Sequence, residues 1–226
     1  MVSTKQSISI ADEPPSIVYP DSDGEPMCDN TLQYDWIVLL KSNLDILLPD
    51  DFVGGNILWY PVEGHPETRV GPDVLVAKGR PKGYRGSYIQ FREAGVAPTA
   101  VFEVLSPSNT LIEMMRKQRF FGVHGAREQI YIDPFNESGF AFVAQGDGIY
   151  LEVEDINGWT SPALGIRFAL EDGKLRVYRP DGAPFLSPAE LAARAEQQSA
   201  RAEQESARAS RLAEKLRALG VDPDAV

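Results

Sequence analysis

Cysteine and histidine are scarce in this chain of 226 residues, which has one cysteine, Cys28, and two histidines, His65 and His124. A single cysteine excludes an intramolecular disulfide bond and a cysteine metal cluster. Neither histidine lies in a ligand spacing such as His-Glu-x-x-His. We therefore expect no zinc site.

The chain also lacks a long apolar run. No stretch approaches the ~20 apolar residues that span a membrane, and no apolar segment follows a basic start as in a secretion signal. The hydrophobic share of 43% and the charged share of 24% are typical of a folded globular domain. These features predict a cytoplasmic protein that does not bind membranes.

Positive charge is in deficit, and the formal net charge is −11. A nonspecific coat on nucleic acid is therefore not expected, because affinity for phosphates comes largely from Lys and Arg. The charges are unevenly distributed: residues 1–35 hold seven acids and one base, whereas residues 71–130 hold five acids and nine bases. The overall acidity thus does not exclude DNA binding by the second region.

Two acidic residues lie in apolar, β-branched segments that predict buried strands. Asp73 precedes Val74-Leu75-Val76, and Glu103 follows Ala100-Val101-Phe102. Taken alone, Asp73 could be a turn residue after Pro72, and Glu103 could face solvent on an edge strand. A buried carboxylate, however, needs a compensating charge or metal. Two strands that bring both acids to one sheet edge would form a site for Mg²⁺, which predicts metal-assisted hydrolysis of a phosphodiester.

Hydrophobic periodicity predicts two helices within this region. One covers residues 31–48 and is capped by Asp29 or Asn30, and the other covers residues 110–122. In the second helix we expect the inward side chains to be Leu111, Met114, Met115 and Phe121. Strands are predicted at 52–61 (bent), 73–77, 100–105, 129–132, 140–143, 149–153 and 174–178. Strands interleaved with helices predict an α/β domain with a mixed sheet.

Lys117 lies on the second helix, three residues after Met114 and four before Phe121. It therefore shares the apolar stripe, which would place its ammonium near both acids. There it could orient or deprotonate an attacking water, or neutralise charge on a phosphate. The other interpretation is a surface lysine whose aliphatic stem packs along the helix.

The segment 78–86 is rich in glycine and basic residues. Such a segment is most often a solvated connection. Its functional interpretation is a contact with a phosphate backbone, for which Lys82 and Arg85 are the candidates.

The C-terminal region has a different composition from the rest of the chain. Ser187-Pro188-Ala189-Glu190 is a capping box, and a run without proline or glycine continues to about Leu219, which predicts a long helix. Gln198 and Glu205 interrupt its heptad seam, so any coiled coil would be weak, and a solvated helix is equally consistent. We thus expect a domain over 1–186, with an irregular arm over 1–30, and a helical tail over 187–226.

An ordered set of motifs resembles the Uma-type restriction endonucleases of the PD-(D/E)XK nuclease superfamily. The motifs are Pro72-Asp73, Glu103-Val104-Leu105-Ser106-Pro107-Ser108, Lys117 and Ile130-Tyr131-Ile132-Asp133-Pro134. The resemblance implies a restriction-endonuclease-like mixed sheet flanked by helices. It also implies a Mg²⁺ site, in which Mn²⁺ could substitute, formed by Asp73, Glu103 and the backbone carbonyl of Val104.

The resemblance differs from the superfamily pattern in one respect. The usual lysine, two residues after the glutamate, falls on Leu105, so the lysine would come from the next helix as Lys117. An additional acid from the N-terminal region sometimes joins such sites, and Glu25 is the candidate here.

The resemblance therefore implies a metal-dependent DNA endonuclease, with RNA or a small phosphoester as a less favoured substrate. Such nucleases commonly cut as dimers, and the tail could assist that pairing. The alternative is an inactive nuclease fold that binds a partner through the tail. The acidic composition and Leu105 favour this alternative. The retained Asp73, Glu103 and Lys117 argue against it.

Overall fold

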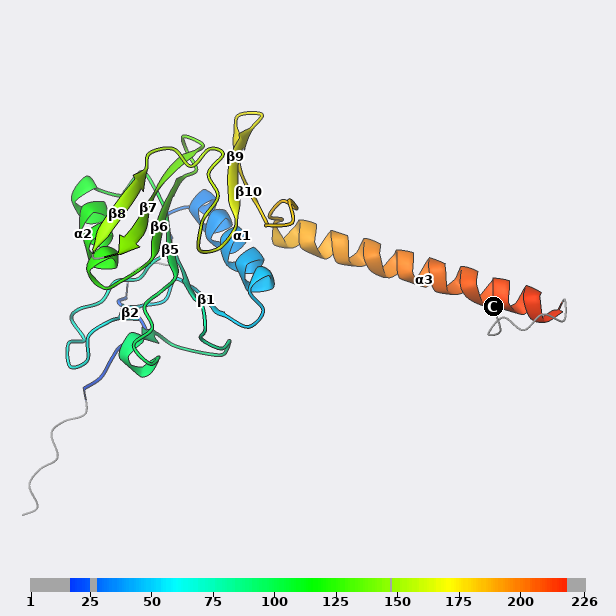
Figure 1. The fold of residues 1–226 in the computed structure, drawn as a ribbon, viewed down its shortest axis with the longest axis horizontal. Coiled ribbons are helices and arrows are strands. Elements are labelled where there is room, and N and C mark those ends of the chain that lie inside the picture. Colours follow the sequence, from blue (N-terminus) through cyan, green and yellow to red (C-terminus); the bar gives the residue numbers. More distant parts are fainter. Residues whose placement is uncertain (1–16, 25–27, 147, 219–226) are drawn as a thin grey trace, which may run out of the picture.

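A six-stranded mixed sheet forms the centre of the computed structural model, which describes residues 17–24, 28–146 and 148–218. The strand order is β1-β3-β5-β6-β7-β8 (Figure 1). Only β5 and β6 run parallel, and the other neighbours are antiparallel. The strands are β1 Phe52–Gly55, β3 Val74–Ala77, β5 Ala100–Val104, β6 Glu128–Asp133, β7 Ser138–Gly146 and β8 Ile149–Val153.

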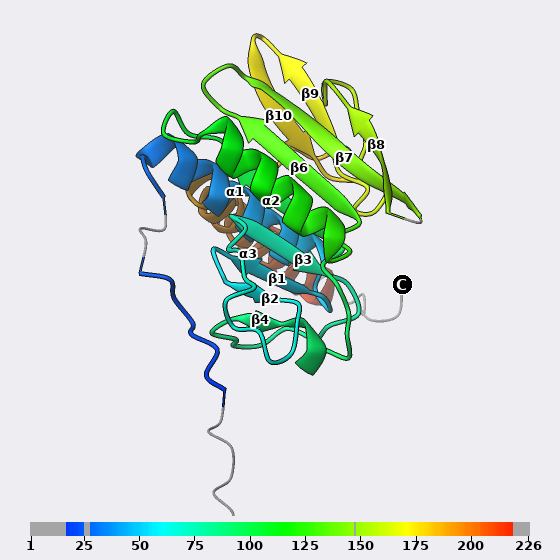
Figure 2. The same ribbon diagram turned by 90° about the vertical axis from the view of Figure 1, so that its left-hand side faces the viewer.

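Two helices, α1 Thr31–Leu47 and α2 Leu111–Val123, cover opposite faces of this sheet, and Figure 2 looks onto the face that α2 covers. Two small strand pairs and the 3-10 helix η1 Gln90–Arg92 complete the body. The pairs are β2 Trp59–Tyr60 with β4 Tyr88–Ile89, and β9 Arg167–Glu171 with β10 Lys174–Tyr178. The predicted α/β class with a mixed sheet flanked by helices is confirmed, although the strands β4 and β9 were not predicted.

Strand alternation divides the core between the two faces of the sheet. Val74, Val76, Phe102 and Val104 pack in the cluster on the α1 side, together with Ile37, Leu40 and Leu44 of α1. Leu75 and Val101 pack in the cluster on the α2 side, together with Phe121 of α2. Because successive side chains of a strand point to opposite faces, Glu103 lies on the α2 side. The candidate acid of β5 thus faces the helix that carries Lys117.

Both predicted helices form, but α2 presents a different face from the one expected. Phe121 is buried and Met114 is half-buried, whereas Leu111 is 76% exposed and Met115 is 61% exposed. The prediction for Leu111 and Met115 was therefore wrong. The half-buried and buried positions Met114, Lys117, Gln118 and Phe121 follow one helical stripe, and this stripe rests on the sheet.

One of the two residues predicted to cap α1 does so. Asn30 is the N-cap, and its side-chain oxygen accepts a hydrogen bond from the Gln33 backbone N–H at 2.9 Å. This satisfies one of the amide groups that a helix leaves unpaired at its start. It also fixes the direction in which the first turn of α1 enters the fold.

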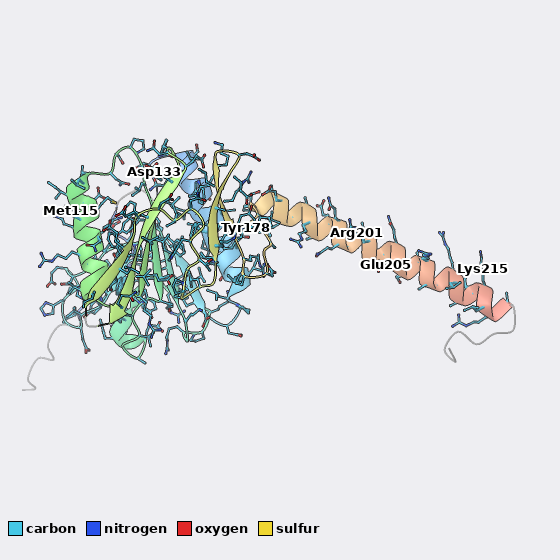
Figure 3. All side chains as sticks on the ribbon, turned by 45° about the horizontal axis from the view of Figure 1, so that its top comes forward. Met115, Asp133, Tyr178, Arg201, Glu205 and Lys215 are labelled. Atoms are coloured by element: carbon cyan, nitrogen blue, oxygen red, sulfur yellow. The ribbon has the colours of Figure 1, made fainter. Side chains whose placement is uncertain are left out.

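The C-terminal helix α3 Pro188–Ala218 extends away from the body (Figures 1 and 3). Its capping box forms, since the Glu190 carboxylate accepts hydrogen bonds from the backbone N–H and hydroxyl of Ser187, both at 2.7 Å. None of its described side chains is buried. The predicted long helix is therefore present, and its pairing as a coiled coil remains a prediction. Among the described residues, no helix has the length and apolar composition to cross a bilayer.

Deletion of residues 187–226 is expected to leave the thermal stability of the body nearly unchanged, because the described part of α3 buries no side chain. A longer deletion that begins at Ala183 is the control, since it also removes Phe185, which is 7% exposed and lies in the core. Loss of a buried aromatic side chain lowers the free energy of unfolding by about 3–5 kcal/mol. In thermal melts followed by circular dichroism, the melting temperatures of the two deletion variants should differ by roughly 10 °C. Equal destabilisation by both deletions would contradict the domain boundary at 186.

Candidate metal centre

Asp73 and Glu103 meet at one edge of the central sheet. The antiparallel register of β3 and β5 pairs Val74 with Phe102, and continuing it by one residue brings Asp73 opposite Glu103. Both side chains are buried, with exposed fractions of 7% for Asp73 and 3% for Glu103. The structure therefore brings together the two acids singled out in the sequence, and neither faces solvent.

Lys117 of α2 contacts Glu103 directly. Its Nζ donates a hydrogen bond to Oε2 of Glu103 at 2.8 Å. The other oxygen, Oε1 of Glu103, is buried and accepts no hydrogen bond from any described residue. Burial raises the pKa of Glu103 to about 8, even though the charge of Lys117 acts in the opposite direction. The carboxyl group therefore has a free acceptor atom in an environment that penalises its own charge.

The charge of Lys117 is maintained by its neighbours. Burial acts to lower the pKa of Lys117, but the nearby Glu103 and Asp73 outweigh burial, and the pKa of this ammonium is raised. A lysine that keeps its proton at neutral pH is a poor general base. Of the three roles expected from the sequence, neutralisation of charge on a phosphate and orientation of the attacking water therefore fit better than deprotonation of that water.

Asp73 is fixed by the backbone of the neighbouring strand. Its Oδ2 accepts a hydrogen bond from the Val104 N–H at 2.7 Å, and burial raises the pKa of this carboxyl group. The Val104 carbonyl, the third expected metal ligand, accepts a hydrogen bond from Nε2 of Gln33 at 2.9 Å. A carbonyl oxygen has two lone pairs, so one remains for a metal ion.

Gln33 is a site residue that the sequence analysis missed. Besides donating to Val104, its Oε1 accepts a hydrogen bond from the Asp29 N–H at 2.8 Å. Gln33 is buried and falls on the same helical stripe as Ile37, Leu40 and Leu44. A polar residue on the apolar stripe of a helix is the signal that could have identified it, because a buried amide needs partners.

A second polar cluster lies beside the acids, at the turn after β5. Oδ2 of Asp29 accepts hydrogen bonds from the hydroxyls of Ser106, at 2.5 Å, and Ser108, and these bonds lower the pKa of Asp29. The hydroxyls of both serines thus donate to one carboxylate. Glu25, the candidate additional acid, lies outside the described residues.

A cleft of about 860 Å³ opens over this region. Asp73 and Lys117 line it, and Gln33 and Asn56 contribute polar atoms. Its charged lining is mainly acidic. The acids are Asp21, Asp23, Asp29, Asp73 and Glu113, and the bases are Arg116 and Lys117.

The residues at the sheet edge fit a magnesium ion. Within the described ranges no group of three His, Cys, Asp or Glu side chains is spaced to hold a metal. A site would therefore consist of two carboxylates, the Val104 carbonyl and water. Mg²⁺ characteristically binds one or two protein carboxylates and keeps several waters. The unpartnered Oε1 of Glu103 supports this assignment, since a buried acceptor atom without a donor is unfavourable unless a cation compensates it.

Replacement of Gln33 by leucine is expected to lower the free energy of unfolding by about 2 kcal/mol, because the Asp29 N–H and the Val104 carbonyl would both lose their partner. Gln204→Leu on the exposed surface of α3 is the matched control and should change stability little. Urea denaturation of the two variants provides the measurement. Equal stability of both variants would contradict a structural role for Gln33.

The solved structures include a similar one, described as a "putative nuclease belonging to DUF820" from Anabaena variabilis. It is 13% identical in sequence, the alignment covers 59% of this chain and 73% of that chain, and the TM-score is 0.44. None of the curated protein sequences that were compared with the chain matches it significantly.

A family model provides the assignment. The model named Uma2 and described as "Putative restriction endonuclease" matches residues 37–171, which is more than half of the chain. The match includes Asp73, Glu103 and Lys117, whereas Asp29 and Gln33 precede it. The predicted resemblance is therefore confirmed, and the chain belongs to the Uma2 family of restriction-endonuclease-like nucleases.

Proposed function

We propose that this protein is a metal-dependent endonuclease that hydrolyses DNA phosphodiester bonds. The supporting observation is the buried pair of Asp73 and Glu103, with Lys117 bound to one oxygen of Glu103 and the other oxygen unpartnered. Two acids in core strands have no packing advantage over apolar residues. Their burial at one sheet edge, beside an open cleft, is typical of a metal site that acts on a ligand.

Asp73, Glu103 and the Val104 carbonyl would hold the ion, with Mg²⁺ as the natural metal and Mn²⁺ as a substitute. When bound, the ion would supply a nucleophilic water and polarise a phosphoryl oxygen. The Val104 N–H keeps Oδ2 of Asp73 in place, and Gln33 fixes the direction of the Val104 carbonyl. Lys117 orients Glu103 and has further N–H groups that can donate to a phosphate oxygen or to the attacking water.

The choice of DNA as substrate rests on family membership. The family description names restriction endonucleases, which act on DNA. The charge of the cleft does not add support for DNA, because acids outnumber bases in its lining. RNA and small phosphoesters are therefore included as competitors in the test below.

A second candidate is a protein that binds a partner through α3 and has no nuclease activity. The exposure of every described turn of α3 favours this candidate. The tail could also assist formation of a homodimer. Light scattering of the full chain and of the chain without residues 187–226 tests that role, and the same number of subunits in both would contradict it.

Cleavage of supercoiled plasmid with Mg²⁺ or Mn²⁺ tests the proposed function. The wild type is expected to cut, and Asp73→Ala and Lys117→Ala are expected to be inactive. Lys174→Ala is the matched control, because Lys174 also pairs with a glutamate, Glu137, at 2.8 Å but is remote from the cleft. If the wild type neither cuts nor binds Mg²⁺ in calorimetry, the partner-binding function takes precedence. If RNA or a small phosphodiester inhibits plasmid cleavage, that competitor replaces DNA as the proposed substrate.

A further inference from the structure

Three of the four cations of the segment 78–86 are already compensated by carboxylates. Lys82 forms an ion pair with Asp45 on α1. Arg80 and Arg85 both bind Glu93, with N–O distances of 2.9 and 2.6 Å. A phosphate that approached Lys82 or Arg85 would have to displace these partners. The segment that the sequence suggested for phosphate contact is therefore poorly suited to it.

Two arginines on the outer side of α2 are in the opposite situation. Arg116 and Arg119 are exposed, and neither forms a hydrogen bond or an ion pair with another residue in the part of the chain that the structure describes. Arg116 and its neighbour Lys117 line the cleft, and Arg119 lies one turn further along α2, outside that lining. Met115, which marks the outer side of α2 in Figure 3, precedes Arg116.

We propose that Arg116, on the α2 wall of the cleft, and Arg119, next to it on the outer side of α2, bind the phosphate backbone of the substrate. This inference rests on the proposed function and assigns the path of the strand. Residues three apart on a helix lie side by side, with about 5–6 Å between their Cβ atoms. The two guanidinium groups can therefore contact neighbouring phosphates of one strand, and each can do so in a bidentate manner.

The distribution of acids in the cleft supports the same path. Asp21, Asp23 and Asp29 come from the segment before α1, and they form a wall that repels a polyanion. The α2 wall has Arg116 and Lys117, with Glu113 as its one lining acid. Repulsion on one side and attraction on the other would place the strand against α2. The scissile phosphate would then lie next to Lys117, where the candidate metal ligands are.

Binding of fluorescein-labelled duplex DNA, measured by anisotropy with Ca²⁺ in place of Mg²⁺, tests this site. Arg116→Ala and Arg119→Ala are each expected to weaken binding roughly fivefold to tenfold and to reduce the slope of log K against log salt by about 1. Arg127→Ala is the matched control. Arg127 is also exposed, so this substitution removes the same charge. It lies next to Glu128, which pairs with Ala100 at the end of β5 remote from Glu103. Lys82→Ala is a second control, and neither control should change the slope.

The outcomes separate this inference from the proposed function. If the wild type binds and cuts DNA but the Arg116 and Arg119 variants retain its salt slope, the inference is wrong and the nuclease assignment stands. If Arg127→Ala weakens binding as much as Arg116→Ala, only overall charge matters and the inference is again overturned. If the wild type binds no DNA, the proposed substrate and this site are rejected together.

Discussion

Replacement of Asp73 by asparagine is expected to abolish cleavage and, at the same time, to stabilise the metal-free protein. Loss of a metal ligand removes several kcal/mol of transition-state stabilisation, which corresponds to a rate reduction of roughly 10³-fold or more. Stability should increase because burial raises the pKa of Asp73, so its ionised form opposes folding at neutral pH. The asparagine oxygen can still accept the hydrogen bond from Val104 N–H.

Thermal melts with and without Mg²⁺ complete this test. Mg²⁺ should raise the melting temperature of the wild type by mass action and leave Asp73→Asn unchanged. Asp155→Asn is the control, because Oδ1 of Asp155 also accepts a backbone hydrogen bond, from Asn157, but on the exposed surface. A destabilised Asp73→Asn variant that still responds to Mg²⁺ would show that Asp73 is a structural residue.

The metal-free protein is expected to lose stability as the pH rises from about 5 to 8. The pKa of Glu103 is about 8 in the folded protein and near 4.5 without burial, so between these values the folded state holds a proton that the unfolded chain has lost. The contribution of Glu103 to stability is therefore highest at the acidic end and falls as the pH rises toward 8, with a slope of at most about 1.4 kcal/mol per pH unit for this one group. The raised pKa values of Asp73 and Glu128 act in the same direction.

Comparison with Glu103→Gln isolates the contribution of Glu103, since the lowered pKa of His124 has the opposite effect in both proteins. Urea denaturation over this pH range should give a shallower decrease for Glu103→Gln than for the wild type. Glu196→Gln on α3 serves as the exposed control. Parallel curves for wild type and Glu103→Gln would contradict the raised pKa. A related expectation is that Mg²⁺ binding at neutral pH releases a proton, which calorimetry in buffers of different ionisation enthalpy detects.

The strands that carry the candidate acids could be predicted because their sequences are compatible with few other secondary structures. Val74-Leu75-Val76 and Ala100-Val101-Phe102 are too apolar for loops and too short for helices, and both form buried strands. The strand β9 was missed because Arg167–Glu171 has charged residues at both ends and only Phe168 and Ala169 are buried. Its pairing with β10 depends on tertiary contacts that local sequence does not encode.

Side-chain environments were harder to predict than elements. Leu111 and Met115 are apolar but exposed, because the inward stripe of α2 is defined by its contact with the sheet rather than by composition. The position of Gln33 depends on the Val104 carbonyl, which is 71 residues away in sequence. The juxtaposition of Asp73 and Glu103 depends on a strand register, and a shift by one residue would turn Glu103 toward α1.

The length of α3 has a consequence for the electrostatics of the whole chain. Its 31 residues span about 46 Å at a rise of 1.5 Å per residue. Charges separated in water by more than about 8 Å are largely screened at physiological ionic strength. A polyanion at the cleft therefore does not sense the distal turns of α3. Because α3 carries five acids and six bases, the net charge of −11 comes from the rest of the chain. The length of α3 would hold anything bound at its far end clear of the sheet edge.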